Sequence, residues 1–229
     1  MSHIIPTLLD CPGCGEACAA ALFESLNGDR IAAQLDAILD GSFERTRCAA
    51  CGLAFQPEHP MLFAMHSARL WIVMYPFEAR IDHSELEPTV AEVLAHGFGE
   101  APGVIGGELQ AVRPRLVFGH YALAEAVRSA RDAIDPPVLE CAKLLAYQRS
   151  LSQLFVLGPV ELVYEQREPA GDLGFGVRAL ANGERLGELR ITGAILDDSA
   201  RLRAAFELSH AELFERPYVS AVRYLLRAA

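Results

Sequence analysis

The chain has 229 residues, 52% hydrophobic and 22% charged, so it can bury a core and has the composition of a globular protein. Its 20 basic and 30 acidic residues leave a net charge of −10, which disfavours general affinity for nucleic acid or an anionic membrane. The sequence shows neither an apolar stretch near the ~20 residues of a membrane-spanning helix nor a secretory signal, so we expect no membrane partner and a cytoplasmic location.

Four of the six cysteines form two Cys-x-x-Cys pairs, Cys11-Pro12-Gly13-Cys14 and Cys48-Ala49-Ala50-Cys51, and glycine follows each pair directly. A tetrahedral zinc site takes each pair of thiolates from one tight turn, and two intervening residues provide that span. Glycine after the second cysteine adopts a positive φ without strain. The pattern predicts a structural Zn²⁺ site with Cys11, Cys14, Cys48 and Cys51 as ligands.

The residues between the two pairs are expected to hold a helix. Residues 15–47 separate the pairs, which exceeds the usual zinc-ribbon interval of about 15–20 residues. Apolar residues recur there at helical spacing, namely Ile31, Leu35, Ile38 and Leu39. We expect Asp29 to cap this helix and Gly41 to end it, so that an inserted helix accounts for the long interval.

Other residues near the pairs offer alternatives to a four-cysteine zinc site. Cys11 and Cys14 alone resemble a redox pair, although Gly15 is a poor residue to open the helix that such a pair needs. Cys18 is a possible spare ligand, but a buried position in a short helical turn explains it as well. Since four thiolates complete the shell, we interpret the histidines that follow the second pair as surface or turn residues; they are His59, His66 and His83.

The next segment is predicted to form strands. Leu53–Phe55 is expected to continue as a strand after the second pair. Two apolar runs, Met61–Met65 and Arg69–Tyr75, are separated by His66-Ser67-Ala68, and this pattern predicts a β-hairpin. Both runs are apolar at successive positions, so we expect helices to cover the sheet that they form.

The rest of the chain alternates helices and strands. A short helix around Thr89–His96 is expected to lead into a glycine-rich loop at 97–107. One helix then carries an apolar stripe from Leu123 to Ile134, and a second runs over Pro137–Gln148 with Cys141 on its buried face. The remaining expected elements are apolar segments at Leu154–Gln166, Gly174–Leu180 and Arg185–Ile191, an Asn182-Gly183 hairpin turn, a helix over Asp198–Phe214, and a final segment at Tyr218–Arg227.

A catalytic site has little support in the sequence. His120, Glu125 and Glu140 could form an acid–base set, but histidines beside helices and solvent-facing glutamates give the same pattern. A closed shell of four thiolates also lacks the open position that catalytic zinc needs. We therefore name no catalytic residue.

The two cysteine pairs and the residues around them resemble the CpXC family, prokaryotic proteins named for paired Cys-Pro-x-Cys motifs and without an assigned biochemical function. The resemblance rests on Cys-Pro-Gly-Cys-Gly, on the helix that Leu26-Asn27-Gly28-Asp29 opens, and on Cys-Ala-Ala-Cys-Gly. It continues through Pro60–Phe63 and a strand ending in Tyr75-Pro76, and more weakly over Leu116–Lys143. Ala49 stands where the motif has proline, which leaves the ligands intact. The resemblance implies a zinc-binding or cysteine-paired module and carries no catalytic residue.

Together these observations predict an α+β fold with a zinc-ribbon-like four-cysteine module, an inserted helix, a mostly antiparallel sheet and flanking helices. Residues 1–85 would form the CpXC-like module, and residues 86–229 an α+β portion packed on it. We expect structural Zn²⁺ and a scaffold or accessory role through a protein partner or self-association. The alternatives are a thiol–disulfide redox protein or a zinc-dependent enzyme.

A nucleic-acid-binding zinc ribbon is disfavoured by charge. Residues 1–60 hold eight acids and three bases, a balance of −5, and phosphate neutralisation needs the opposite sign. The charged residues counted are Asp10, Glu16, Glu24, Asp29, Asp36, Asp40, Glu44, Glu58, Arg30, Arg45 and Arg47.

Overall fold

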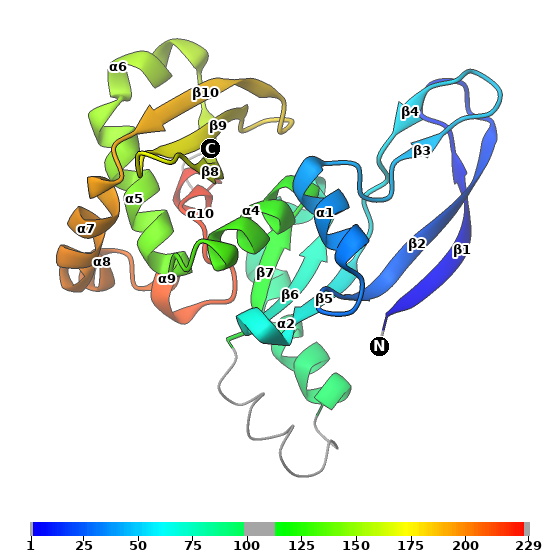
Figure 1. Ribbon diagram of the computed structural model, residues 1–229, viewed down its shortest axis with the longest axis horizontal. Helices are drawn as coiled ribbons and strands as arrows, with labels where there is room; N and C mark the ends of the chain where they lie inside the picture. Colours follow the sequence, from blue (N-terminus) through cyan, green and yellow to red (C-terminus); the bar gives the residue numbers. More distant parts are fainter. Residues whose placement is uncertain (1, 99–112, 227–229) are drawn as a thin grey trace.

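A computed structural model describes residues 2–98 and 113–226, which form a five-stranded sheet, a three-stranded sheet and a two-stranded hairpin (Figure 1). The five-stranded sheet has the order β1–β2–β5–β6–β7, and its strands are β1 (His3–Asp10), β2 (Ala17–Asn27), β5 (Met61–Met65), β6 (Leu70–Tyr75) and β7 (Arg115–Phe118). The β1–β2 and β5–β6 pairs are antiparallel, whereas β2–β5 and β6–β7 are parallel, so this sheet is mixed.

The first two strands form a long hairpin that projects from the body of the molecule (Figure 1). Only Ser25–Asn27 of β2 pairs with β5, so the rest of β2 pairs with β1 alone. The small hairpin of β3 (Thr46–Arg47) and β4 (Ala54–Phe55) lies beside it. We call residues 3–24 and 44–56 together the cysteine arm.

Cys18 lies in strand β2, and its prediction in a short helical turn was wrong. The alanines of Ala17–Ala21 favour a helix when taken alone. In the structure they pair residue by residue with Pro6–Asp10 of β1, and Cys18 and Leu22 are buried. Cross-strand pairing therefore overrides local propensity in this segment.

The inserted helix α1 (Ala32–Asp40) is present and ends at Gly41 in the left-handed conformation (φ 77°), as the sequence predicted. Its N-terminal cap was predicted wrongly. Asp29 does not cap α1; its carboxylate accepts a hydrogen bond from the Ser67 hydroxyl and, at 2.6 Å, one from the His66 backbone N–H. The Asp29 carboxylate thus binds the turn between β5 and β6 instead of the N-terminus of α1. Ile31 occupies the N-cap position of α1 and forms no side-chain hydrogen bond there.

The β5–β6 hairpin forms as predicted, with a short 3₁₀ turn η1 (His66–Ala68) between its strands. On one face Phe63 and Ile72 pack with α1 and with α4 (His120–Arg131). On the other face Trp71 and Val73 pack with α2 (His83–Phe98). Helices therefore cover both faces, as the apolar pattern of these strands predicted.

Helix α2 begins earlier than predicted. It starts at His83, directly after the 3₁₀ segment η2 (Phe77–Asp82), and continues through Pro88 instead of starting behind it. The loop predicted at 97–107 overlaps the end of α2 at Gly97 and Phe98, and its other residues lie outside the described part of the chain.

The C-terminal half begins with helix α5 (Pro136–Arg149), which packs against an antiparallel sheet of order β10–β9–β8. Helix α6 (Leu151–Leu154) and the turn η3 (Phe155–Leu157) occupy the start of the apolar segment predicted from Leu154. The strands are β8 (Val160–Arg167), β9 (Leu173–Ala179) and β10 (Arg185–Ile191). The turn predicted at Asn182-Gly183 is confirmed, since Gly183 has φ 70° and Asn182 Oδ1 accepts the Glu184 N–H at 3.0 Å.

The helix predicted over Asp198–Phe214 is wrong as a single element. The segment folds as α7 (Ala194–Arg201), α8 (Arg203–Ser209) and α9 (Glu212–Glu215), and α10 (Val222–Leu226) follows. Phe206 of α8 and Leu213 of α9 both pack in the apolar cluster around Cys141 of α5. Cys141 is buried there, as predicted.

The chain is thus a mixed α+β protein, as its sequence predicted. β7 pairs with β6 across residue 85, and the division at that residue stays a prediction. Within the described residues, no helix has both the length and the apolar character needed to cross a membrane.

Candidate metal centre

The two cysteine pairs occupy two turns of the same construction. Cys11–Cys14 forms the tip of the β1–β2 hairpin, and Cys48–Cys51 connects β3 to β4. In each turn the residue after the second cysteine donates its N–H to the carbonyl of the first cysteine, Gly15 to Cys11 at 2.8 Å and Gly52 to Cys48 at 3.0 Å. The two glycines have φ of 74° and 75°, the left-handed conformation that the sequence pattern predicted.

These turns bring four sulfurs together. The Sγ atoms of Cys11, Cys14, Cys48 and Cys51 all lie within 4.8 Å of one another. Two of the separations cross between the turns, 3.6 Å from Cys11 to Cys51 and 3.7 Å from Cys14 to Cys48. A tetrahedron with Zn–S bonds of about 2.3 Å has sulfur–sulfur edges of about 3.8 Å. The four cysteines are therefore positioned to bind a metal ion.

Residues around the sulfurs are small or donate N–H groups. The Gly13 N–H points at Cys11 Sγ at 3.4 Å, as expected around a thiolate ligand. A Cβ atom on Gly13 would lie 2.8 Å from a methyl carbon of Leu53, so a larger residue there would require the exposed Leu53 side chain to move. Cys11 and Cys48 are buried while Cys14 and Cys51 are exposed, so the cluster lies at the surface of the arm.

Ionisation of the thiols is uneven without a cation. Backbone N–H groups of Cys51 and Ala50 lower the pKa of the Cys48 thiol to about 6. The Glu16 backbone also lowers the pKa of Cys14, but the neighbouring sulfur of Cys51 and burial outweigh it and raise that pKa to about 12. One thiolate thus suppresses the ionisation of its neighbours, and a bound divalent cation would remove this opposition.

Cys18 and the three histidines do not join the sulfur cluster. Within the described part of the chain, the four cysteines are the whole of the cluster. Cys18 packs beside Cys11 and Cys48, but its Sγ donates to the Glu16 carbonyl at 3.6 Å. His59 lies against Glu44, with 2.9 Å between Nε2 and Oε2.

The prediction of surface or turn histidines holds for His66 and fails for His83. His66 is exposed in the turn between β5 and β6. His83 is only 5% exposed, and its ring lies 5.1 Å from the ring of Tyr218. Its burial follows from α2 beginning at this residue and packing against the C-terminal segment.

The residues of the possible acid–base set have other partners. His120 Nε2 lies 2.8 Å from the Pro57 carbonyl oxygen. The carboxylates of Glu125 and Glu140 each lie 2.7 Å from Nζ of Lys143, which is the only lysine of the chain. Glu125 and Glu140 are therefore buried partners of one ammonium group instead of solvent-facing side chains.

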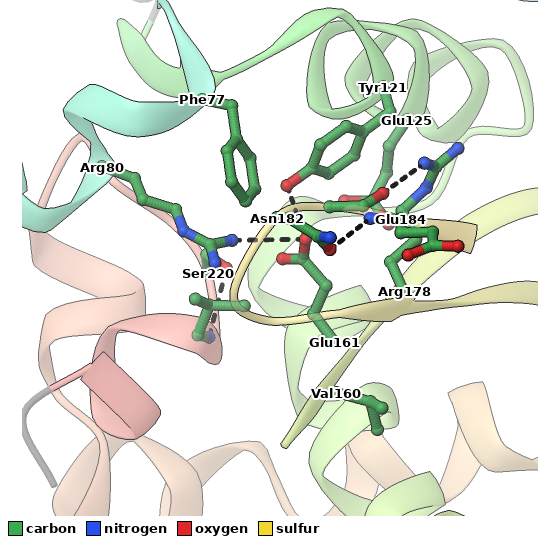
Figure 2. A network of polar contacts seen from close by, with 12 residues as sticks. Phe77, Arg80, Tyr121, Glu125, Val160, Glu161, Arg178, Asn182, Glu184 and Ser220 are labelled. Atoms are coloured by element: carbon green, nitrogen blue, oxygen red, sulfur yellow. Dashed lines mark hydrogen bonds and ion pairs between the residues drawn. The ribbon is translucent and has the colours of Figure 1, made fainter. Parts of the chain in front are cut away.

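A second buried ionic cluster lies beside the first. Figure 2 shows Arg80 and Tyr121 converging on the carboxylate of Glu161, at 3.3 Å and 2.5 Å. Burial raises the pKa of Glu161, against the Tyr121 hydrogen bond and the charge of Arg80. We call Arg80, Glu125, Glu140, Lys143 and Glu161 together the buried ionic network.

Sequence reasoning missed this network because its partners are distant along the chain. Arg80 and Glu161 are 81 residues apart, and Tyr121 and Glu161 are 40 apart. One local signal was present, since Lys143 follows Glu140 by three residues on a helix whose other positions are largely apolar. The cavity among these residues measures about 30 Å³, far below the range of about 300–1,000 Å³ that small-molecule sites occupy. The network consequently has no room for a substrate.

Comparison with known proteins identifies the family. Residues 9–143 match the family described as CpXC protein. No curated protein and no solved structure matches the chain. The matched span covers more than half of the sequence and includes both cysteine turns, the inserted helix and the β5–β6 hairpin. The chain is therefore a member of the CpXC family.

Proposed function

We propose that this protein binds one Zn²⁺ ion through Cys11, Cys14, Cys48 and Cys51, and that it acts as a non-catalytic accessory or scaffold protein. The observation that carries this proposal is the single cluster of four sulfurs within 4.8 Å of one another. Four soft thiolates in a tetrahedral arrangement favour Zn²⁺ over Mg²⁺ or Ca²⁺, which prefer oxygen ligands.

The shell of four thiolates supports a structural role for the ion. Catalytic zinc keeps a position open for water or substrate, and four protein ligands fill a tetrahedral shell. The ion would join the tip of β1–β2 to the β3–β4 turn. Among the described residues, the apolar cluster at this end of the arm consists of Cys11, Cys18 and Cys48 with Phe55 packed against them, so a metal ion would replace a missing core.

The arm also supports a protein-interaction role. Three large apolar side chains are exposed on β1, with Ile4 47%, Ile5 39% and Leu8 75% accessible. β1 is an edge strand of the five-stranded sheet, and the arm projects from the body (Figure 1). Residues 1–60 carry a balance of −5, so the partner would present an apolar surface with basic residues around it.

Metal analysis of the purified full chain tests the zinc assignment. We expect one Zn²⁺ per chain and a melting temperature that falls when a strong chelator removes the ion. A chain without zinc that forms a reversible Cys11–Cys14 disulfide would instead support the redox alternative.

Site-specific photo-cross-linking in cells tests the interaction role. A photoreactive residue at Leu8 is expected to capture a defined protein or a second copy of this chain. The matched control is Leu208, which is 90% exposed on α8, far from the arm in sequence. Equal capture at Leu8 and Leu208, or no capture at Leu8, would contradict the proposed role of the arm.

A further inference from the structure

A cleft of about 630 Å³ lies apart from the metal centre and shares Arg115 with the small cavity of the buried ionic network. It is bounded by the start of β6, the segment before β7, the end of α4, the start of α5 and the segment after α9. That last segment lies beside β7, since the Leu116 N–H donates to the Pro217 carbonyl at 3.0 Å (Figure 1). The volume falls within the range of about 300–1,000 Å³ that small-molecule sites occupy.

The cleft concentrates positive charge in an acidic protein. Five of the chain's 20 basic residues line it, against two acidic residues, Asp135 and Glu215. The five are Arg69, Arg113, Arg115, Arg203 and Arg216. A concave surface with a local excess of guanidinium groups attracts anions even when the net charge is −10.

Only part of this charge is neutralised within the protein. Arg203 pairs with Asp135 at 3.0 Å, and Arg113 donates to the Phe214 carbonyl. Arg69 and Arg216 are exposed, and neither forms an ion pair within residues 2–98 and 113–226. Two guanidinium groups therefore remain free to bind a ligand at the mouth of the cleft.

Arg115 supplies an independent indication of a ligand. This side chain is only 9% exposed, lines the cleft, and has two buried nitrogens, Nε and Nη1, without a hydrogen-bond partner. The nearby carboxylates of Glu125 and Glu140 favour the charged form of Arg115, but both pair with Lys143 and neither accepts a hydrogen bond from Arg115 Nε or Nη1. A buried donor without an acceptor is destabilising, more so when it is charged, and an oxyanion in the cleft would supply the acceptor.

The remaining walls are apolar. Leu70, Ile134 and Phe214 line the cleft together with Pro136, Pro137 and Pro217. A bare inorganic anion would leave these surfaces without contacts. The combination of guanidinium groups with an apolar wall fits a ligand that has both negative groups and an apolar part.

We propose that this cleft binds a small organic anion that carries two or more carboxylate or phosphate groups on an apolar body, with Arg115, Arg69 and Arg216 as its anion-binding residues. Arginine binds both oxyanions through paired N–H donors, so the two chemistries share one site. Binding does not involve the cysteine centre.

Calorimetric titration of the zinc-loaded full chain tests this proposal with three probes, namely pyrophosphate, phthalate and ATP without a divalent cation. We expect phthalate or ATP to bind more tightly than pyrophosphate, because pyrophosphate lacks an apolar part. Preference for phthalate would indicate a carboxylate ligand, and preference for ATP a phosphorylated one. Failure of all three probes to bind would overturn the proposal.

Variants locate the binding. Arg69→Gln and Arg216→Gln, both at exposed positions, are each expected to weaken the best probe about tenfold, and Arg115→Met by about tenfold or more. Arg30→Gln is the matched control, because Arg30 is exposed, unpaired among the described residues and outside the cleft. If Arg30→Gln weakens binding as much as Arg69→Gln and Arg216→Gln do, the anion responds to overall charge and the proposal is wrong. Arg69→Gln and Arg216→Gln still test whether the anion binds in the cleft if Arg115→Met does not fold.

Discussion

The cysteine arm and the buried ionic network are two regions where polar groups join distant parts of the chain, and they do so under opposite conditions. In the arm, four sulfurs meet at the surface with hardly any apolar core around them. In the network, carboxylates and cations meet inside the body, between packed helices and strands. Under the proposed zinc binding, a polar cluster replaces a core in the arm, whereas the network lies within a core.

The two regions should respond to different perturbations. Under the proposed zinc binding, the order of the arm depends on a metal ion that supplies binding free energy directly. The buried ion pairs of the network contribute little net stability, because burying charges costs desolvation free energy. Removing one partner is nevertheless strongly destabilising, because the other charge is left buried without compensation. Four substitutions follow, from the largest expected effect to the smallest; the first two test this contrast, and the last two sharpen it with single contacts of Asp29 and His59.

Cys48→Ser should have the largest effect and should confine it to the arm. Loss of one of four ligands should cost several kcal/mol of the roughly 10–16 kcal/mol that a structural zinc ion supplies. Hydrogen exchange should show loss of protection in β1 and in residues 44–56, while β5 and β6 stay protected. Cys141→Ala is the control, because Cys141 is buried in α5 and should leave the zinc content unchanged. Equal loss of protection across the whole chain would contradict the separation of the two regions.

Lys143→Met should destabilise the body without affecting metal content. The change leaves Glu125 and Glu140 buried without their shared cation, which typically costs about 3–5 kcal/mol. Denaturant unfolding of the zinc-loaded protein measures the loss. Arg149→Met, on the same helix, removes a half-exposed ion pair with Asp198 and should cost no more than about 1 kcal/mol. Similar losses of unfolding free energy for the two variants would show that burial does not determine how much an ion pair contributes to stability.

Asp29→Ala should cost about 1–2 kcal/mol, since it removes the acceptor for the His66 and Ser67 N–H groups. Amide exchange should quicken at His66 and Ser67 instead of at the first turn of α1. Asp36→Ala is the control, since it removes only an exposed pair with Arg131. Faster exchange at the start of α1 would restore Asp29 as the helix cap.

His59→Gln should change the pH dependence of stability by about 1 kcal/mol or less. Burial alone would lower the pKa of His59, but Glu44 outweighs it and raises the pKa above the ordinary value of 6.5. The contribution is therefore complete below pH 6.5 and is lost as pH rises through the higher folded-state pKa. Unfolding free energies of both proteins across this window, with zinc bound, should converge at the alkaline end. A constant difference at all pH values would contradict the ion pair with Glu44.

The contrast also explains what could be predicted from the sequence. The cysteine turns could be predicted because each is set by neighbouring residues, including a glycine at positive φ. The helices α1 and α5 could be predicted from apolar periodicity. The partner of Asp29 lies 37 residues away, and Arg223 and Glu87 of another buried ion pair are 136 residues apart, so local patterns cannot reveal them. Strand β2 was missed because its alanines become strand-forming only through pairing with β1.

The most direct test of the central claim is X-ray absorption spectroscopy at the zinc edge of the purified full chain. We predict four sulfur ligands at about 2.3 Å and no nitrogen or oxygen in the first shell. A first shell that contains a nitrogen or oxygen ligand, or fewer than four sulfurs, would contradict a closed structural site formed by Cys11, Cys14, Cys48 and Cys51.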